Sequence, residues 1–412
     1  MAHLRQEVEP DEAGLDPAAL ARLDRHFARQ VDDGRLPGFL VSVSRHGRTA
    51  HLTAYGYRDV RRRLPVETDT LWRMYSMTKP VTSVAALILM EEGRFGLDTP
   101  VADFLPAFAD PQVYAEGAGR SLRTRPAGQP ILVRHLLMHT AGLTYGFYHA
   151  HPVDARYREA GIGSSVVPGT SLAETCEAYA RLPLQFEPGT QWNYSVATNV
   201  LGRLVEVASG QDLDDFLAGR VFAPLGMKDA GLCVREDQAP RLAELYGETK
   251  DGVGITPVPG LPLRGRPRLL SGSGGMVATA HDYHRFMEFL RRRGELDGVR
   301  LLSADTVAAM TSNQLPGGAD LRAFGSPVHR RPGKAGLGFG LGVSVVTEPG
   351  LTPSPSVRGA YGWNGVASTT FWVDPRNDLT VQFLTQLRPT GSHTVYPELR
   401  HLVHEAMTAS AD

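Results

Sequence analysis

The stretch Leu71-Trp-Arg-Met-Tyr-Ser-Met-Thr-Lys-Pro80 decides the fold, because it sets Ser76 three residues before Lys79 at the start of an apolar segment. Residues three apart on a helix share a face, so the hydroxyl and the amine can come within hydrogen-bond reach. Such a pair can make serine nucleophilic if burial or a nearby cation lowers the lysine pKa. Alone, Ser-x-x-Lys more often marks a helix cap followed by an exposed lysine.

The residues that follow this pair are apolar on nearly every side. Val81 and residues 84–90 carry no charge, which indicates a helix buried in a core. Pro80 is compatible with the first turn, and residues 91–93, Glu-Glu-Gly, predict a polar end with a glycine cap. We therefore expect Lys79 at the shielded end of a buried helix.

Composition narrows the possible functions of the 412 residues. The net charge of −1 provides no field to attract nucleic acid or an anionic membrane, and the arginine runs 61–63 and 291–293 have acidic neighbours. Cys176 and Cys233 are too few for a disulfide framework and lack metal-site spacing, which favours a reduced compartment. With no apolar signal segment and no run of about 18 apolar residues, we expect a soluble, cytoplasmic protein.

The spacing of apolar residues, and the order of the helices and strands that it indicates, predict an α/β (α+β) fold. An antiparallel sheet is expected from both ends of the chain, with a mainly helical middle inserted as a lobe. The predicted lobes are residues 1–70 with 265–412, and residues 71–264, with the active site between them. The predicted strands are residues 38–44, 49–57, 338–347, 367–373 and 379–384, and the predicted helices include 17–31, 212–218, 281–292 and 396–408.

Long irregular segments are expected to form walls of a substrate cleft, since long loops in compact domains are usually functional or disordered. They are residues 111–130, 145–170, 314–336 and 348–360. The alternating glycines of residues 336–342 predict a strand with one bare face, open to close approach by a helix or by substrate.

Two further motifs carry chemistry. In Pro188-Gly-Thr-Gln-Trp-Asn-Tyr-Ser-Val196, a turn delivers Tyr194 just before a helical run. A phenol near a cationic amine loses its proton more easily and could accept the proton of Ser76. Gly362-Trp-Asn-Gly-Val366 is expected to open a strand, so that the Val366 and Ser76 N–H groups could stabilise an oxyanion.

The order of these three motifs resembles the serine β-lactamase and penicillin-binding-protein superfamily, in the branch of class C β-lactamases and their esterase relatives. Leu136-Leu-Met-His-Thr-Ala-Gly-Leu143 and Ser271-Gly-Ser-Gly-Gly-Met276 are also similar to stretches of that branch. The resemblance implies that Ser76 is the nucleophile, Lys79 assists its deprotonation and Tyr194 shuttles protons. It also implies an oxyanion hole formed by the Ser76 and Val366 amides.

Two departures from the lactamase pattern bear on the substrate. Val196 stands where Tyr-x-Asn would place asparagine, and Trp363-Asn364-Gly365 replaces a Lys-Thr-Gly triplet whose lysine binds a carboxylate in the family. These variants are similar to family VIII carboxylesterases and statin-type acyltransferases. The resemblance therefore implies a serine carboxylesterase that acts on neutral short to medium acyl esters through an acyl-enzyme, with possible transesterase activity.

The sequence also offers candidate residues for the substrate pocket and alternatives to the esterase function. Tyr145, Phe147, Tyr148 and Trp192 join Trp363 as a candidate aromatic acyl pocket. Asn364 and Gly365, next to Trp363, are also expected to contact the substrate. His135 and His139 have metal-compatible spacing but no accompanying glutamate motif, so packing is favoured and no cofactor is expected. No Gly-x-Ser-x-Gly occurs, which argues against the α/β-hydrolase fold. The alternatives are a β-lactamase or D-amino-acid peptidase, and an acyl-binding sensor without turnover. The expected partner is a small ester, and the oligomeric state is not indicated.

Overall fold

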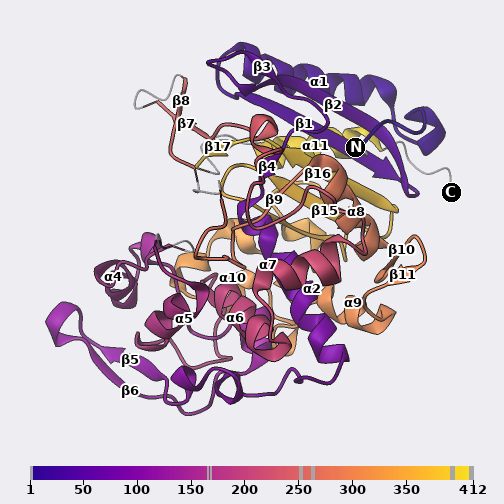
Figure 1. Ribbon diagram of the computed structural model, residues 1–412. Helices are drawn as coiled ribbons and strands as arrows, with labels where there is room; N and C mark the ends of the chain where they lie inside the picture. Colours follow the sequence, from indigo (N-terminus) through magenta and orange to yellow (C-terminus); the bar gives the residue numbers. More distant parts are fainter. Residues whose placement is uncertain are drawn as a thin grey trace.

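The computed structural model describes residues 3–164, 167, 169–249, 254–260, 265–389 and 395–407. Strands from both ends of the chain form one eight-stranded antiparallel sheet, as predicted (Figure 1). In spatial order these strands are β12 (Leu337–Phe339), β13 (Ser344–Val346), β14 (Tyr361–Asn364), β15 (Thr370–Asp374), β16 (Leu379–Leu384), β1 (Gly38–Arg45), β2 (Arg48–Asp59) and β3 (Leu64–Pro65).

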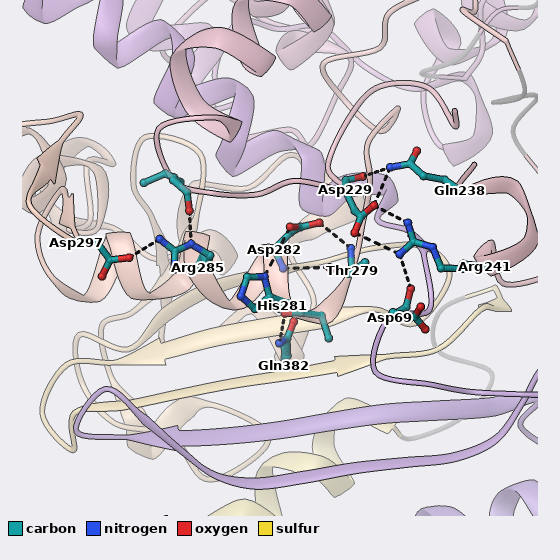
Figure 2. Close-up of polar contacts among 12 residues, drawn as sticks. Asp69, Asp229, Gln238, Arg241, Thr279, His281, Asp282, Arg285, Asp297 and Gln382 are labelled. Carbon is teal, nitrogen blue, oxygen red and sulfur yellow. Dashed lines mark hydrogen bonds and ion pairs between the residues drawn. The ribbon is translucent and has the colours of Figure 1, made fainter. Parts of the chain in front are cut away.

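The sheet is covered on both faces, which explains why every residue of β1 is buried. On one face α1 (Pro17–Asp32) packs beside α11 (Val395–Ala406), and the Phe27 ring lies 4.6 Å from that of Phe383 (Figure 1). On the other face lies α8 (Ala280–Arg291), which begins with a Thr279–Asp282 capping box. The Gln382 side chain of β16 donates to the Ala280 carbonyl at 2.8 Å (Figure 2).

The middle of the chain is mainly helical. At its centre α2 (Thr78–Glu91) is buried from Thr78 through Leu89 and packs against α6 (Ala197–Ser209), as its apolar sequence predicts. The other helices are α3 (Val133–Leu137), α4 (Pro152–Glu159), α5 (Leu172–Ala180), α7 (Leu213–Leu217), α9 (Ala304–Met310) and α10 (Leu321–Phe324). The division into two lobes stays a prediction.

Outside the main sheet, short strands form small sheets of two or three strands. The paired sets are β4 (Trp72–Arg73) with β9 (Val277–Ala278), β5 (Gln112–Glu116) with β6 (Arg123–Pro126), β10 (Glu295–Leu296) with β11 (Val299–Arg300), and β17 (Leu387–Arg388) with β7 (Tyr246–Glu248) and β8 (Ile255–Pro257). The β5–β6 hairpin corrects the expectation that residues 111–130 are irregular, and α4 does the same within residues 145–170.

Two predicted strands were wrong in detail. Residues 338–347 form β12 and β13, separated by a turn in which Gly340 N–H donates to the Val343 carbonyl at 2.8 Å. The glycines allow close approach there, since a Cβ at Gly342 would lie 2.1 Å from the Ser83 Oγ of α2. The Gly362–Val366 motif ends β14 instead of opening a strand, and β15 begins at Thr370 instead of Ala367.

The helix predictions were confirmed to within a residue or two. The ranges 17–31, 212–218 and 281–292 correspond to α1, α7 and α8, and 396–408 corresponds to α11, although residue 408 lies outside the described residues. Among the described residues, no helix combines the length and apolar character that crossing a bilayer requires. Cys176 and Cys233 are both free thiols.

The segment that leads into Ser76 is held by long-range pairing. Leu71 N–H donates to the Arg241 carbonyl at 2.9 Å, and β4 pairs with β9. Figure 2 shows how Arg241 is fixed in turn, by an ion pair with Asp229 and a 3.1 Å hydrogen bond to the Asp69 carbonyl. Because these contacts come from distant parts of the chain, the position of Ser76 depends on the complete fold.

Candidate active site

Ser76 lies in a single 3-10 turn, Tyr75–Met77, directly before α2. The Thr78 hydroxyl donates to the Tyr75 carbonyl at 2.6 Å and accepts from Met276 N–H at 3.1 Å, which ties the turn to the residue directly before β9. Tyr75 has a φ of 47°, a left-handed conformation that is uncommon outside glycine. Strained residues of this kind are concentrated at functional sites, where the surrounding structure holds them in place.

Lys79 lies one helical turn after Ser76, as the spacing predicts. Its side chain is only 1% exposed, and its Nζ lies 3.4 Å from Ser76 Oγ. The same Nζ donates to the Ser273 carbonyl at 2.7 Å. Burial lowers the Lys79 pKa well below its ordinary value, which favours the neutral amine. A neutral amine beside a serine hydroxyl can accept its proton.

The Ser273 carbonyl is a part of the site that the sequence did not single out. The Asn199 side chain of α6 accepts hydrogen bonds from Ser273 N–H and from the Ser271 hydroxyl, both at 3.0 Å. Asn199 therefore fixes the loop whose carbonyl orients Lys79. The similarity of residues 271–276 to the family pattern was the one available signal, and it gave no role for the backbone.

Tyr194 stands over Lys79, with the centroid of its ring 4.6 Å from the Lys79 Nζ. Burial raises the pKa of its phenol to about 12, although the Ser76, Trp363 and Tyr145 side chains partly counteract this. The expectation of an easily ionised phenol was therefore wrong, because the neighbouring lysine is itself buried and favours its neutral form. The phenol oxygen is buried, and in the described part of the chain no group makes a hydrogen bond of good geometry to it.

The Gly362–Val366 motif reaches the serine through close packing. A Cβ at Gly365 would lie 2.6 Å from the Met74 carbonyl oxygen and 2.3 Å from the Thr369 Oγ1, so only glycine fits there. Val366 lines the same cavity as Ser76, and no backbone carbonyl of the described residues accepts its N–H. This placement is compatible with the predicted oxyanion hole.

A cavity of about 590 Å³ opens beside Ser76. It is lined by every predicted aromatic residue, namely Tyr145, Phe147, Tyr148, Trp192 and Trp363, together with Tyr194 and Asn364. Gly365 does not line the cavity, so its predicted contact with substrate was wrong. It instead allows the chain to pack closely against Met74 and Thr369. Of the four long segments, 145–170 and 314–336 contribute lining residues, whereas no described residue of 111–130 or 348–360 does.

His139 supports the aromatic wall from behind. It is buried, its Nδ1 lies 3.3 Å from Ser195 Oγ, and its ring lies 4.9 Å from that of Tyr194. Burial lowers its pKa well below the ordinary value, so the ring is neutral. The residues that the structure describes contain no group of three or more potential metal ligands, and His135 Nδ1 accepts a hydrogen bond from Leu132 N–H at 3.1 Å.

Comparison with known proteins agrees with this geometry. The family model described as Beta-lactamase matches residues 23–405. Esterase EstB of Burkholderia gladioli is 31% identical over 404 residues, which are 93% of this chain and 95% of that protein.

Two solved structures share the fold at similar coverage. EstCE1, described as a hydrolase with promiscuous acyltransferase activity, has a TM-score of 0.78 at 27% identity, covering 95% of this chain and 99% of that one. Unliganded simvastatin synthase LovD from Aspergillus terreus has a TM-score of 0.77 at 25% identity, covering 95% and 98%. The suspected resemblance is confirmed, and the chain belongs to the Beta-lactamase family, in a branch whose named relatives include esterases and acyltransferases.

Proposed function

We propose that this protein is a serine carboxylesterase that hydrolyses short to medium acyl esters through an acyl-enzyme on Ser76. The observation that carries the proposal is the approach of a buried, neutral Lys79 to Ser76 Oγ, at 3.4 Å, beside a largely aromatic cavity. The names of the relatives, among them an esterase and a hydrolase with acyltransferase activity, support this reaction class.

In the acylation step Lys79 accepts the Ser76 proton while Oγ attacks the ester carbonyl carbon. The N–H groups of Ser76 and Val366 stabilise the resulting oxyanion. When the tetrahedral intermediate collapses, the bond to the alkoxide breaks. Tyr194 donates its proton to that alkoxide and recovers one from protonated Lys79, which leaves the acyl-enzyme and a free alcohol.

Deacylation reverses these transfers with a second acceptor. Water loses a proton to Lys79 through Tyr194 and attacks the acyl carbon. When the bond to Ser76 Oγ breaks, protonated Lys79 returns the proton to Oγ, which releases the acid and restores Ser76 and neutral Lys79. An alcohol that enters the cavity would give a new ester instead, which is the transesterase activity suggested by acyltransferases such as that of Penicillium decumbens among the relatives. A raised Tyr194 pKa suits this role, since a phenol that keeps its proton at neutral pH can donate it.

The test is hydrolysis of 4-nitrophenyl butyrate by the wild type and Ser76→Ala. We expect a loss of at least about 10⁴-fold in kcat, with an unchanged circular dichroism spectrum and Tm. Turnover that survives the substitution would refute Ser76 as nucleophile. Hydrolysis of nitrocefin faster than that of the ester would favour the β-lactamase alternative, and a stable acyl adduct without product release would favour the sensor.

A further inference from the structure

The cavity beside Ser76 is lined by cations without a balancing acid. Arg331, Lys334 and Arg388 all contribute to its wall, and none of its described lining residues is Asp or Glu. No ion pair joins any of these three side chains to a carboxylate within the described ranges. The imbalance is local, because the whole chain carries a net charge of only −1.

Two of these cations gather around one histidine. The Lys334 Nζ lies 6.0 Å from the centroid of the Trp192 ring, and the His329 ring stands edge-on to the same indole at 4.7 Å. Burial, with contributions from Lys334 and Arg331, lowers the His329 pKa to about 3, so its ring is neutral. Like charges held together without a counter-ion raise the free energy of the site, and a bound anion relieves that cost.

Buried hydrogen-bonding groups in the same wall also lack partners. His329 is 8% exposed and Trp192 is 1% exposed. Neither His329 Nε2 nor Trp192 Nε1 has a hydrogen-bond partner among the residues described. A buried polar group left unpaired costs about 1–3 kcal/mol, so oxygen atoms of a ligand would satisfy these groups.

This cluster lies one aromatic ring away from the proposed catalytic group. The Trp192 and Tyr194 rings stack with centroids 6.4 Å apart, and Lys334 lies against Trp192. A substrate whose ester reaches Ser76 can therefore place a second functional group near Lys334. Trp363 does remove the family's lysine, but cations from the loop of residues 314–336 supply positive charge elsewhere in the cavity.

We propose that the preferred substrates are esters that also carry a carboxylate, and that Lys334, Arg331 and His329 form the subsite that binds it. The inference rests on the proposed esterase function and specifies its substrate class. Lys334 and Arg331 supply the charge, and neutral His329 donates a single hydrogen bond to a carboxylate oxygen. The carboxylate takes no part in the bond changes at Ser76.

The test compares matched pairs of esters. In one pair the acyl group carries the charge: 4-nitrophenyl hemiglutarate against methyl 4-nitrophenyl glutarate. In the other the alcohol carries it: 4-carboxyphenyl butyrate against 4-(methoxycarbonyl)phenyl butyrate. We expect the wild type to prefer the anionic member of one pair in kcat/KM, and that pair shows which side of the ester faces Lys334.

Variants decide whether the subsite causes this preference. Lys334→Met should lower the anionic-to-neutral ratio of kcat/KM by about ten- to hundredfold, mainly through KM. Lys334→Arg should retain most of the ratio, and Lys228→Met, at an exposed lysine outside the cavity, should leave it unchanged. Raising the salt from about 0.1 to 1 M should reduce the wild-type ratio.

A wild type with no anionic preference in either pair would overturn the subsite, as would a ratio that Lys334→Met leaves intact. If Lys334→Met does not fold, the exposed Arg331→Gln variant decides by the same ratio, with an expected decrease of about threefold or more. The experiment distinguishes failure of the carboxylate subsite from failure of the proposed esterase function. Ser76-dependent hydrolysis of neutral esters without an anionic preference removes only the subsite, whereas the absence of any ester turnover removes the esterase.

Discussion

Lys334 lines the cavity, whereas Lys79 is buried behind Ser76, and their surroundings favour opposite uses of the same side chain. Lys79 is 1% exposed, and its Nζ is fixed between the Ser273 carbonyl and Ser76 Oγ. Lys334 ends a 3-10 turn, Pro332–Lys334, where it is half-buried and lines the cavity, with its Nζ 6.0 Å from the centroid of an indole ring. Burial and the neighbouring Arg331 lower the Lys334 pKa, but by less than burial lowers that of Lys79. An amine enclosed by protein atoms is held neutral and can act as a base, whereas an amine that a ligand can reach can bind an anion.

The largest expected effect comes from removing the amine next to the serine. Lys79→Met should lower kcat for 4-nitrophenyl butyrate by about 10³- to 10⁵-fold, because Ser76 then has no proton acceptor. Lys334→Met should cost less than about tenfold on the same neutral ester. The measurement is steady-state kinetics on both purified variants. Similar losses in the two variants would contradict the distinction between the two lysines.

Sequence reasoning anticipated the residues around Ser76 better than the cations that line the cavity from residues 314–336. Ser76, Lys79 and Tyr194 were predicted because each lies in a motif whose spacing or order has a chemical meaning. Arg331 and Lys334 were not, since residues 314–336 have no periodicity from which their meeting with Trp192 could be inferred. The sheet and α2 followed from hydrophobic patterns, which report burial directly.

The error about Tyr194 has a different physical cause. The sequence places a phenol near an amine but does not give the degree of burial of either group. Because both are enclosed, desolvation raises the phenol pKa and lowers the amine pKa, and each group favours its neutral form. For this reason the proposed mechanism uses Lys79, and not Tyr194, as the acceptor of the Ser76 proton.

The second prediction tests that assignment. Tyr194→Phe should lower kcat by about 10²- to 10⁴-fold, because the alkoxide then leaves without a proton donor. The loss should be smaller for 4-nitrophenyl butyrate than for ethyl butyrate, since nitrophenolate is a stable leaving group that needs no proton. Equal losses on both esters would indicate that Tyr194 acts in another step, such as deacylation, or only in packing.

The smallest effect, and the one that most directly compares the two lysines, is on stability. The folded protein carries an uncharged Lys79 over a pH range in which the unfolded chain, with a lysine pKa near 10.5, is protonated. Since the unfolded state binds the additional proton there, wild-type stability rises with pH up to that value. Lys79→Met removes this term and should raise the free energy of unfolding by about 1–3 kcal/mol at pH 7.

Urea unfolding of wild type, Lys79→Met and Lys334→Met at a series of pH values between neutral and mildly alkaline would measure this difference. The gain of Lys79→Met over wild type should shrink as the pH rises, because the unfolded lysine then loses its proton as well. Lys334→Met should show a smaller gain, since its half-buried side chain retains contact with solvent. A gain for Lys79→Met that does not change with pH would mean that packing, and not the enclosed neutral amine, separates Lys79 from Lys334.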